Sequence, residues 1–330
     1  MPISTSSESF QAAFIQSYKQ DGDAVRAELS MGLLAPQAMT SPKYLYDALG
    51  SRLFAAICEL PEYYPTRTEA AIFADHLPEI AQSVGTGATL IDLGAGNCAK
   101  AARLFESLQP SQYVPIDISV DFLRDAVGLL KQQYPEIEML GLGLDFSGAM
   151  ILPQAVQRRQ RLFFYPGSSI GNFNPPQAVE FLRRLREACE VDGHAEGGLL
   201  IGVDLIKDKA ILDAAYADAL GVTAAFNLNL LSHLNNLLGA NFYLRDWRHR
   251  AFFDVERSRI EMHLEARRGA TVIWKGGQRH FVEGERIHTE NSYKYTQDGF
   301  IKLLEQAGFG RVSTWTDRRN WFMVCHAHAV

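Results

Sequence analysis

The chain has 330 residues, of which 47% are hydrophobic and 21% charged, a composition that excludes wholesale disorder and allows a sizeable core. Its 32 basic and 38 acidic residues give a net charge of −6, which provides no electrostatic footprint for nucleic acid. The sequence shows no signal-peptide pattern, no apolar run near the roughly 18 residues of a membrane span, and four scattered cysteines without a C-x-x-C pair, so we expect a cytoplasmic protein that binds no membrane.

The first part of the chain reads as helical and irregular. Both SESFQAAFIQSYKQ (7–20) and SRLFAAICEL (51–60) space their apolar residues as a helix does. From residue 68 onward, helices alternate with short apolar strands. Helices are expected at 68–84, 100–108, 120–134 and 178–189, and strands at 89–93, 113–119, 137–142, 161–167 and 197–204. This alternation predicts a parallel sheet with helices on both faces.

The second half of the chain changes character. Residues 207–242 are strongly helical, and 249–288 contain alternating segments typical of antiparallel strands. Residues 298–317 and 321–330 then predict a helix and two strands that return to the first sheet. We therefore expect an α/β fold with a Rossmann-like doubly wound sheet and an inserted second α+β domain. The expected division is 68–205 with 289–330 for the first domain, and 1–67 with 206–288 for the second.

A glycine-rich turn follows the first expected strand, in LIDLGAGNCAK (90–100). Residues 94–99 formally satisfy the dinucleotide pattern G-x-G-x-x-A, so a nicotinamide oxidoreductase is one alternative. The acidic Asp92 just before the first glycine instead resembles motif I of the class I S-adenosylmethionine methyltransferases. In such enzymes the glycines, here Gly94 and Gly96, let the backbone approach the cofactor closely.

Further cofactor contacts are expected where later strands end. Asp117 is placed to accept hydrogen bonds from the ribose hydroxyls, and Asp145 with Phe146 is placed at the adenine. Lys100, just after the glycine turn, completes this expected cofactor set. The alternative is that these aspartates only cap turns and helices.

Several longer segments carry a more specific resemblance. They are SPKYLYDALGSRLFAAICELPEYYPTRTEA, LIDLGAGNCAK, GSSIGN, GVDLIKD, AAYADALGVTAAFNLNLL, RIEMHLEARR and HTENSYKY. Together they closely resemble the L-histidine Nα-methyltransferase family of ergothioneine biosynthesis. The resemblance covers nearly the whole chain, in the right order.

This resemblance implies the reaction and its substrate. Three molecules of S-adenosylmethionine would trimethylate the α-amine of L-histidine to hercynine, with S-adenosylhomocysteine as the other product and no metal. We expect a monomer whose partner is this small molecule. The chain could also be a methyltransferase for another amino acid or a tryptophan-derived amine, which would favour an apolar group in place of Glu290, or a silent S-adenosylmethionine-binding protein.

The resemblance also implies roles for individual residues. Tyr63 and Asn172 would hold the amine and carboxylate region, and they are the expected catalytic pair that orients the amine lone pair. Tyr216 would contact the carboxylate, whereas Tyr46 would lie near the cofactor. The imidazole pocket would be formed by Met262, Glu290 and Ser292.

The residues themselves are compatible with these roles. A site for an imidazole needs a polar partner for a ring nitrogen, and Glu290 and Ser292, two apart on a strand, would share one face. Met262 lies in an apolar alternation and could equally be plain core, and the Tyr63 turn could serve only packing. His326 and His328 beside Cys325 could suggest a metal site, but alternation along a terminal strand explains them.

Overall fold

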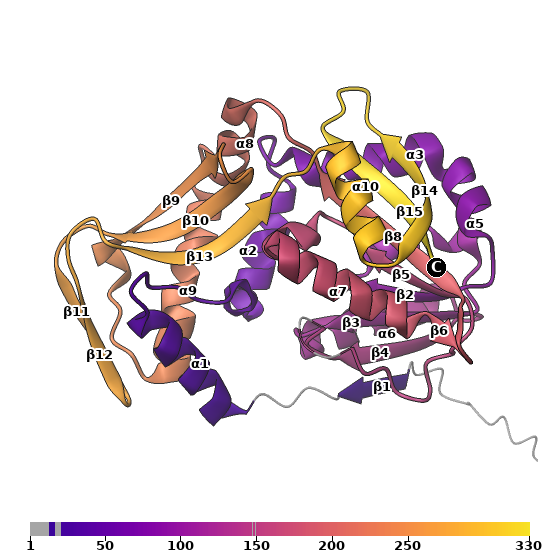
Figure 1. The fold of residues 1–330 in the computed structure, drawn as a ribbon. Helices are drawn as coiled ribbons and strands as arrows, with labels where there is room; N and C mark the ends of the chain where they lie inside the picture. Colours follow the sequence, from indigo (N-terminus) through magenta and orange to yellow (C-terminus); the bar gives the residue numbers. More distant parts are fainter. Residues whose placement is uncertain (1–12, 17–20, 147, 149) are drawn as a thin grey trace, which may run out of the picture.

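The computed structural model describes residues 13–16, 21–146, 148 and 150–330. Two lobes lie side by side in Figure 1. One lobe contains an eight-stranded sheet with helices packed on both faces, and the other contains a three-stranded sheet, a two-stranded hairpin and several helices.

The large sheet has the strand order β1-β4-β3-β2-β5-β8-β15-β14. Its strands are β1 (Ala13–Gln16), β2 (Thr89–Leu93), β3 (Gln112–Asp117), β4 (Glu138–Gly143), β5 (Arg161–Tyr165), β8 (Gly197–Asp204), β14 (Phe309–Thr316) and β15 (Phe322–Ala329). The first six strands in this order pair in parallel, whereas β15 is antiparallel to β8 and to β14. The predicted doubly wound sheet is confirmed.

Helices cover both faces of this sheet, which is why β2 and β5 are buried at every residue. The helices of this lobe are α3 (Tyr64–Val84), α4 (Ala99–Ala102), α5 (Phe105–Leu108), α6 (Val120–Gln133), α7 (Pro175–Ala188) and α10 (Gln297–Gln306). The single helix expected at 100–108 is in fact two short ones. The break lets Leu104, Phe105 and Leu108 all pack into one core cluster.

One expectation about the N-terminal region is wrong. Residues 13–16, within the stretch predicted as helical, form the edge strand β1, which pairs in parallel with β4. The remainder of that stretch, 7–12 and 17–20, lies outside the described residues. The pairing of β1 with β4 provides hydrogen-bond partners for the N–H and C=O groups on the open edge of β4, which would otherwise be exposed to water. Gly141 makes this possible, because a Cβ at Gly141 would stand only 2.5 Å from the ring of Phe14.

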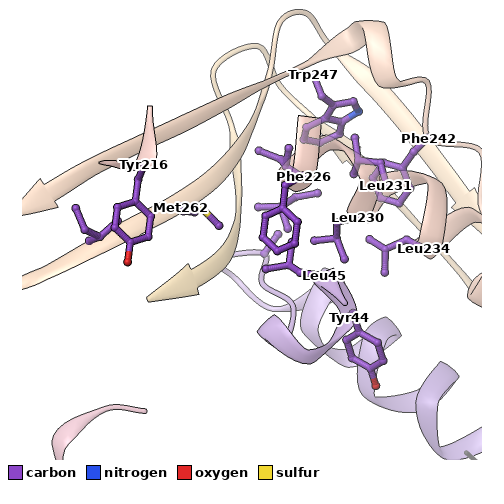
Figure 2. Packing of buried hydrophobic residues seen from close by; sticks show 14 of the residues in the cluster. Tyr44, Leu45, Tyr216, Phe226, Leu230, Leu231, Leu234, Phe242, Trp247 and Met262 are labelled. Carbon is purple, nitrogen blue, oxygen red and sulfur yellow. The ribbon is translucent and has the colours of Figure 1, made fainter. Parts of the chain in front are cut away.

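The second lobe confirms the predicted antiparallel strands. Its strands are β9 (Trp247–Asp254), β10 (Arg259–Ala266), β11 (Ala270–Trp274), β12 (Gly277–Phe281) and β13 (Arg286–Tyr293), and its helices are α1 (Gly22–Leu34), η1 (Pro42–Leu45), α2 (Ala48–Cys58), α8 (Lys209–Tyr216) and α9 (Val222–Leu238). The helical stretch 207–242 divides at Gly221, which has a positive φ of 77°. Figure 2 shows Tyr216, Phe226, Trp247 and Met262 in the hydrophobic cluster of this lobe.

A β-bulge in β13 decides which side chains face the inside of this lobe. Met262 of β10 pairs with Glu290, but the next residue, His263, pairs with His288, so Thr289 is the extra residue. Ile287 belongs to the buried core of the lobe. Without the extra residue, strict alternation would send Glu290 to the face opposite Ile287. The bulge instead turns Glu290 and Ser292 to the inner face. The expected boundary at 289 thus falls within β13.

The motif near the C-terminus is structural. Cys325 is buried in the core beneath the large sheet, and the neighbouring His326 has its Nδ1 at 2.8 Å from the Ser83 hydroxyl. All four cysteines are free. In the described part of the chain, no helix is both long and apolar enough to cross a membrane.

Candidate active site

A pocket lies where the two lobes meet, and it gathers most of the predicted site residues. Its empty space, including the part open to solvent, is about 480 Å³. Its lining residues are Tyr46, Phe54, Ile57, Tyr63, Gly167, Ser168, Ser169, Asn172, Ala215, Tyr216, Thr223, Phe226, Met262, Glu290 and Ser292. The predicted substrate residues and Tyr46 are all included, although they come from segments up to 246 positions apart, Tyr46 and Ser292 being the extremes.

Aromatic rings form one wall of this pocket. Tyr46 meets Phe54 and Phe226 edge to face, with ring centroids 5.5 Å apart in both pairs. Phe54 continues to Tyr63 at 6.1 Å, and Tyr63 continues to Tyr216 at 6.1 Å. Such electron-rich rings favour a cation near their faces. Burial raises the pKa of both Tyr46 and Tyr63 well above the usual value, so their hydroxyls stay protonated.

The sequence places Tyr63 in the pocket and its neighbour outside it. Helix α3 begins at Tyr64 with Pro65 in its first turn, and Tyr63 is the residue just before that helix. The Tyr64 hydroxyl points elsewhere and donates to the buried carboxylate of Asp204 at 2.7 and 2.8 Å. Of the two tyrosines, one therefore lines the pocket and the other serves the packing between the lobes.

Asn172 lies against Glu290. With the amide oriented so that its nitrogen faces acceptors, Asn172 Nδ2 donates to Glu290 Oε1 at 3.3 Å and to the Asn291 carbonyl at 3.0 Å. Gly171 permits this approach, because a Cβ there would stand 2.8 Å from the Tyr293 carbonyl oxygen. Both N–H groups of the amide are thereby used, so Asn172 Oδ1 is left to accept a hydrogen bond.

Glu290 is held in a poorly solvated position. Burial raises its pKa to about 7, although the positive charge of Lys294 acts in the opposite direction. A carboxyl group with a pKa near neutrality can change its protonation state in the physiological range. Met262 faces it across the strand pair and is 1% exposed, so this residue is at once core and pocket wall.

Ser292 and Tyr216 are linked to a buried lysine. The Tyr216 hydroxyl donates to Ser292 Oγ at 2.9 Å, and Lys294 Nζ donates to Ser292 Oγ at 2.8 Å and to the Tyr216 hydroxyl at 3.2 Å. Lys294 also forms an ion pair with Asp204 at 2.7 Å. This floor of the pocket is therefore fixed by a hydrogen-bonded network.

The expected cofactor residues gather at the carboxyl end of the large sheet. Gly94 and Gly96 both have positive φ, 70° and 54°, which glycine adopts without strain. Asp117 braces this turn, because its Oδ2 accepts from Gly96 N at 3.0 Å and its Oδ1 accepts from Ser119 N at 2.8 Å. A Cβ on Gly96 would meet no atom within 4 Å, so the turn faces open space.

Phe146 and Asp145 complete this edge. The Phe146 ring lies over the glycine turn, 3.7 Å from where a Cβ of Gly94 would stand. Asp145 forms a 3.8 Å ion pair with Lys43 of the other lobe. Asp92, in contrast, is 2% exposed and accepts from the Tyr113 hydroxyl, so it supports the sheet rather than facing the cleft.

Lys100 connects the glycine turn to the pocket through a buried glutamate. Lys100 Nζ donates to Glu69 Oε2 at 2.7 Å, and Gly167 N donates to Glu69 Oε1 at 2.7 Å. Glu69 is 1% exposed and fits because Gly202 has no side chain, since a Cβ there would stand 2.1 Å from Glu69 Oε1. One carboxylate therefore holds both Lys100 and the loop that precedes Asn172.

Sequence reasoning missed the residues that support the site. Glu69, Asp204 and Lys294 are charged residues, which are seldom buried unless they are paired, and only the structure shows their burial. Phe54 and Phe226 look like ordinary apolar positions of amphipathic helices. The signal that could have found Lys294 is its spacing, since it continues the two-residue spacing of Glu290 and Ser292 just past the end of β13.

One group of possible metal ligands lies away from the pocket. Glu261, His263 and His288 could each bring one ligand atom within 4.8 Å of the others. They lie on the face of the three-stranded sheet opposite Met262 and Glu290. Glu261 is already paired with Arg259 and with His263. The prediction that the reaction needs no metal stays a prediction.

Comparison with known proteins gives one consistent result. The family model described as "Histidine-specific methyltransferase, SAM-dependent" matches residues 25–329. The chain is 37% identical over 301 residues to the histidine N-alpha-methyltransferase of Mycolicibacterium smegmatis, covering 89% of this chain and 92% of that protein. It is 34% identical over 309 residues to the protein of that name from Mycobacterium tuberculosis, covering 91% and 93%.

A longer fungal protein is also similar. The chain is 32% identical over 285 residues to ergothioneine biosynthesis protein 1 of Neurospora crassa, which covers 82% of this chain and 31% of the fungal protein. The match to this relative therefore concerns only part of a larger protein.

Proposed function

The chain belongs to the family of histidine-specific, S-adenosylmethionine-dependent methyltransferases, and from this premise we propose that its pocket binds L-histidine and methylates the α-amine. The observation that carries the proposal is the pocket itself. It combines a carboxylate and a hydroxyl on one strand face, Glu290 and Ser292, with a wall of aromatic rings. The first pair suits an imidazole, and the wall suits a methylated ammonium.

The cofactor would lie across the carboxyl end of the large sheet. The open space at Gly96 allows close approach to the backbone, and Phe146 offers an apolar surface beside it. Asp117 would accept from the ribose, Asp145 would face the adenine, and Lys100 would attract the carboxylate of the methionyl part. When bound, S-adenosylmethionine supplies an electrophilic methyl group.

The substrate would be held at three points. Glu290 and Ser292 would bind the imidazole, with Met262 against the ring. Tyr216 would contact the carboxylate, and Tyr63 with Asn172 would hold the amine. This arrangement would present the amine nitrogen toward the end of the pocket formed by Tyr46.

The amine must lose a proton before it can attack. An α-amine titrates near ~8, so a substantial part is protonated in neutral water. Asn172 Oδ1, left free by the two N–H bonds of the amide, would accept from one amine hydrogen and so direct the lone pair toward the methyl group. Water at the open side of the pocket would carry the released proton away. The aromatic wall would then stabilise the growing positive charge, by roughly 0.5–2 kcal/mol for each ring.

Two further methyl transfers would give hercynine, the trimethylated product, with one S-adenosylhomocysteine released each time. The similarity to ergothioneine biosynthesis protein 1 supports a place in ergothioneine formation. Glu290 in the pocket supports histidine over a tryptophan-derived amine, because a site for the latter is expected to have an apolar group at this position.

We also keep several broader expectations as proposals. The two lobes would act as a cofactor domain and a substrate domain, with the boundary moved from 289 to the end of β13 at Tyr293. The protein would work as a monomer, without nucleic acid or membrane. The four free cysteines support a cytoplasmic location.

Product analysis tests the proposal directly. The purified protein is incubated with S-adenosylmethionine and each of the common amino acids in turn, and product masses are measured. We expect histidine alone to gain one, two and then three methyl groups. Methylation of a different amino acid, or no methylation by protein that still binds S-adenosylhomocysteine, would overturn it.

A further inference from the structure

A buried lysine lies under the floor of the pocket. Lys294 follows Ser292 by two residues, just beyond the end of β13, and its side chain is 1% exposed. Its ammonium lies within hydrogen-bonding distance of Asp204, Ser292 and Tyr216. The three N–H groups of the ammonium are therefore all engaged.

The charge of Lys294 is stabilised from the side away from the pocket. Asp204 is fully buried, and besides Lys294 it accepts from Tyr64 and Lys207. Burial alone would raise the pKa of Asp204, but the two lysines outweigh it and hold that pKa below its usual value. Burial likewise opposes the charge on Lys294, but Asp204 holds the pKa of the lysine above its usual value. Lys294 is thus a fixed positive charge.

Hydrogen-bond counting then fixes the direction of the Ser292 hydroxyl. Ser292 Oγ accepts from both Lys294 and Tyr216, which uses its two lone pairs. Those two are the bonds that Ser292 makes among the residues that the structure describes. Its own hydrogen is left for a ligand, and Ser292 lines the pocket. Toward a ligand, Ser292 can act only as a donor.

We propose that Lys294 is a positioning residue that fixes Ser292 as a hydrogen-bond donor, so that the pocket selects a neutral imidazole with its bare nitrogen toward Ser292 and its N–H toward Glu290. This inference rests on the proposed function. A neutral imidazole has one N–H and one bare nitrogen, which matches one acceptor and one donor. An imidazolium would set an N–H against the Ser292 hydrogen and a positive charge near Lys294. A ring without a bare nitrogen would leave the serine unsatisfied, which is costly in a buried site.

The protonation state of the bound ligand can be read directly. Histidine labelled with ¹⁵N in the ring is bound to the protein with S-adenosylhomocysteine, and its nitrogen chemical shifts are measured by NMR. We expect one protonated and one bare ring nitrogen at neutral pH. Two protonated nitrogens would overturn the inference. A protein that binds S-adenosylhomocysteine but no histidine would instead overturn the proposed function.

Kinetics separate positioning from a merely structural role. The variants are Lys294→Met, Ser292→Ala and the double variant, each assayed with histidine and with 3-(2-thienyl)-L-alanine, whose ring has no nitrogen. If Lys294 acts through Ser292, each single change lowers kcat/KM for histidine at least tenfold, and the double variant loses little more than either single one. The thienyl substrate is affected far less. Losses that multiply, or equal losses for both substrates, would overturn the inference.

Two further proteins guard against a folding defect. Lys294→Met leaves Asp204 with one fewer partner, so Asp204→Asn/Lys207→Met/Lys294→Met removes all three charges of the buried cluster. This variant is expected to bind S-adenosylhomocysteine and still to lose discrimination between histidine and the thienyl substrate; retained discrimination would count against the inference. Lys302→Met, on the exposed side of α10, is the matched control and should behave as the parent protein.

Discussion

Glu290 lies directly opposite Met262 across the β10–β13 pair, although His263 and His288 next to them follow a register shifted by one residue. The bulge at Thr289 accounts for the shift, and the Thr289 hydroxyl secures it by donating to the Met262 carbonyl at 3.1 Å. This β-bulge therefore determines the direction of the Glu290 side chain, whose carboxylate we assign to the imidazole.

Replacing Glu290 with Gln tests that assignment. The change removes a charged acceptor, and hydrogen bonds to charged groups contribute about 1.5–3 kcal/mol, so kcat/KM for histidine should fall about 10- to 100-fold.

The dependence of KM on pH should change as well. Burial raises the pKa of Glu290 to about 7, so the carboxylate is present above that pH and is lost below it. The KM for histidine of the parent protein should rise as the pH falls through about 7. The Gln variant shares the titration of the substrate but should lack this step, and an identical step in both proteins would contradict the assignment.

Tyr63→Phe tests the contact with the amine. Removing the hydroxyl while keeping the ring should lower kcat for histidine about tenfold, the effect of about 1.4 kcal/mol, and should leave the affinity for S-adenosylhomocysteine unchanged. Steady-state kinetics and calorimetry measure the two quantities. Tyr243→Phe is the control, because Tyr243 is 60% exposed. Unchanged turnover together with unchanged KM for histidine in Tyr63→Phe would refute a role of the hydroxyl.

Asp117→Ala tests the expected cofactor site. Asp117 accepts from the backbone N–H groups of Gly96 and Ser119, so its loss should loosen the glycine turn and also remove the expected ribose acceptor. Calorimetry should show S-adenosylhomocysteine binding weakened at least tenfold, with histidine kinetics affected only through the cofactor. Asp125→Ala, on the exposed face of α6, should bind as the parent protein does. Equal affinity in the two variants would argue against a cofactor at this turn.

Glu69→Gln tests the link between the two halves of the site. Glu69 holds Lys100 and Gly167 together, so the neutral variant should raise the KM for both S-adenosylmethionine and histidine. Stability should fall by about 1–2 kcal/mol, less than for a fully buried pair because Lys100 is partly exposed. Glu79→Gln on the same helix is the control, since Glu79 is an exposed residue paired with His76. A rise in only one of the two KM values would show that Glu69 does not couple the sites.

The lowered pKa of Glu265 predicts how the free energy of unfolding depends on pH. Burial acts to raise its pKa, but hydrogen bonds from Arg248, Arg286 and Arg250 outweigh it and lower the pKa to about 2. A carboxyl group with a depressed pKa stabilises the fold above its unfolded pKa, near ~4.3, and this contribution is lost as the pH falls toward 2. Glu265→Gln should therefore lower the free energy of unfolding at pH 7 by about 1–3 kcal/mol, with the difference shrinking below pH 4. Denaturant titrations at several pH values measure it, and Glu256→Gln on the exposed turn between β9 and β10 is the control. A constant difference across this range would contradict the prediction.

The sequence by itself determined the large sheet and the position of the glycine turn. Short apolar strands alternating with helices can bury both faces only in a parallel sheet, so hydrophobic period alone predicts that architecture. The position of the turn at Gly94 and Gly96 could be predicted for a similar reason. The turn needs residues with a positive φ, and glycine adopts that conformation without help from distant segments. The motifs around Tyr63, Asn172 and Glu290 likewise indicated the family before any distance was known.

Only the tertiary structure decided how the site is built. The bulge that turns Glu290 inward depends on pairing with a strand some thirty positions earlier, and the charge on Lys294 depends on Asp204, which stands on the other sheet. Residues 13–16 are a further case, because their apolar residues are spaced as in a helix but the segment forms a strand that pairs with the open edge of β4. Burial, ion pairing and edge pairing are interactions between distant segments, and their free energy outweighs the weak local preferences that a sequence pattern reports.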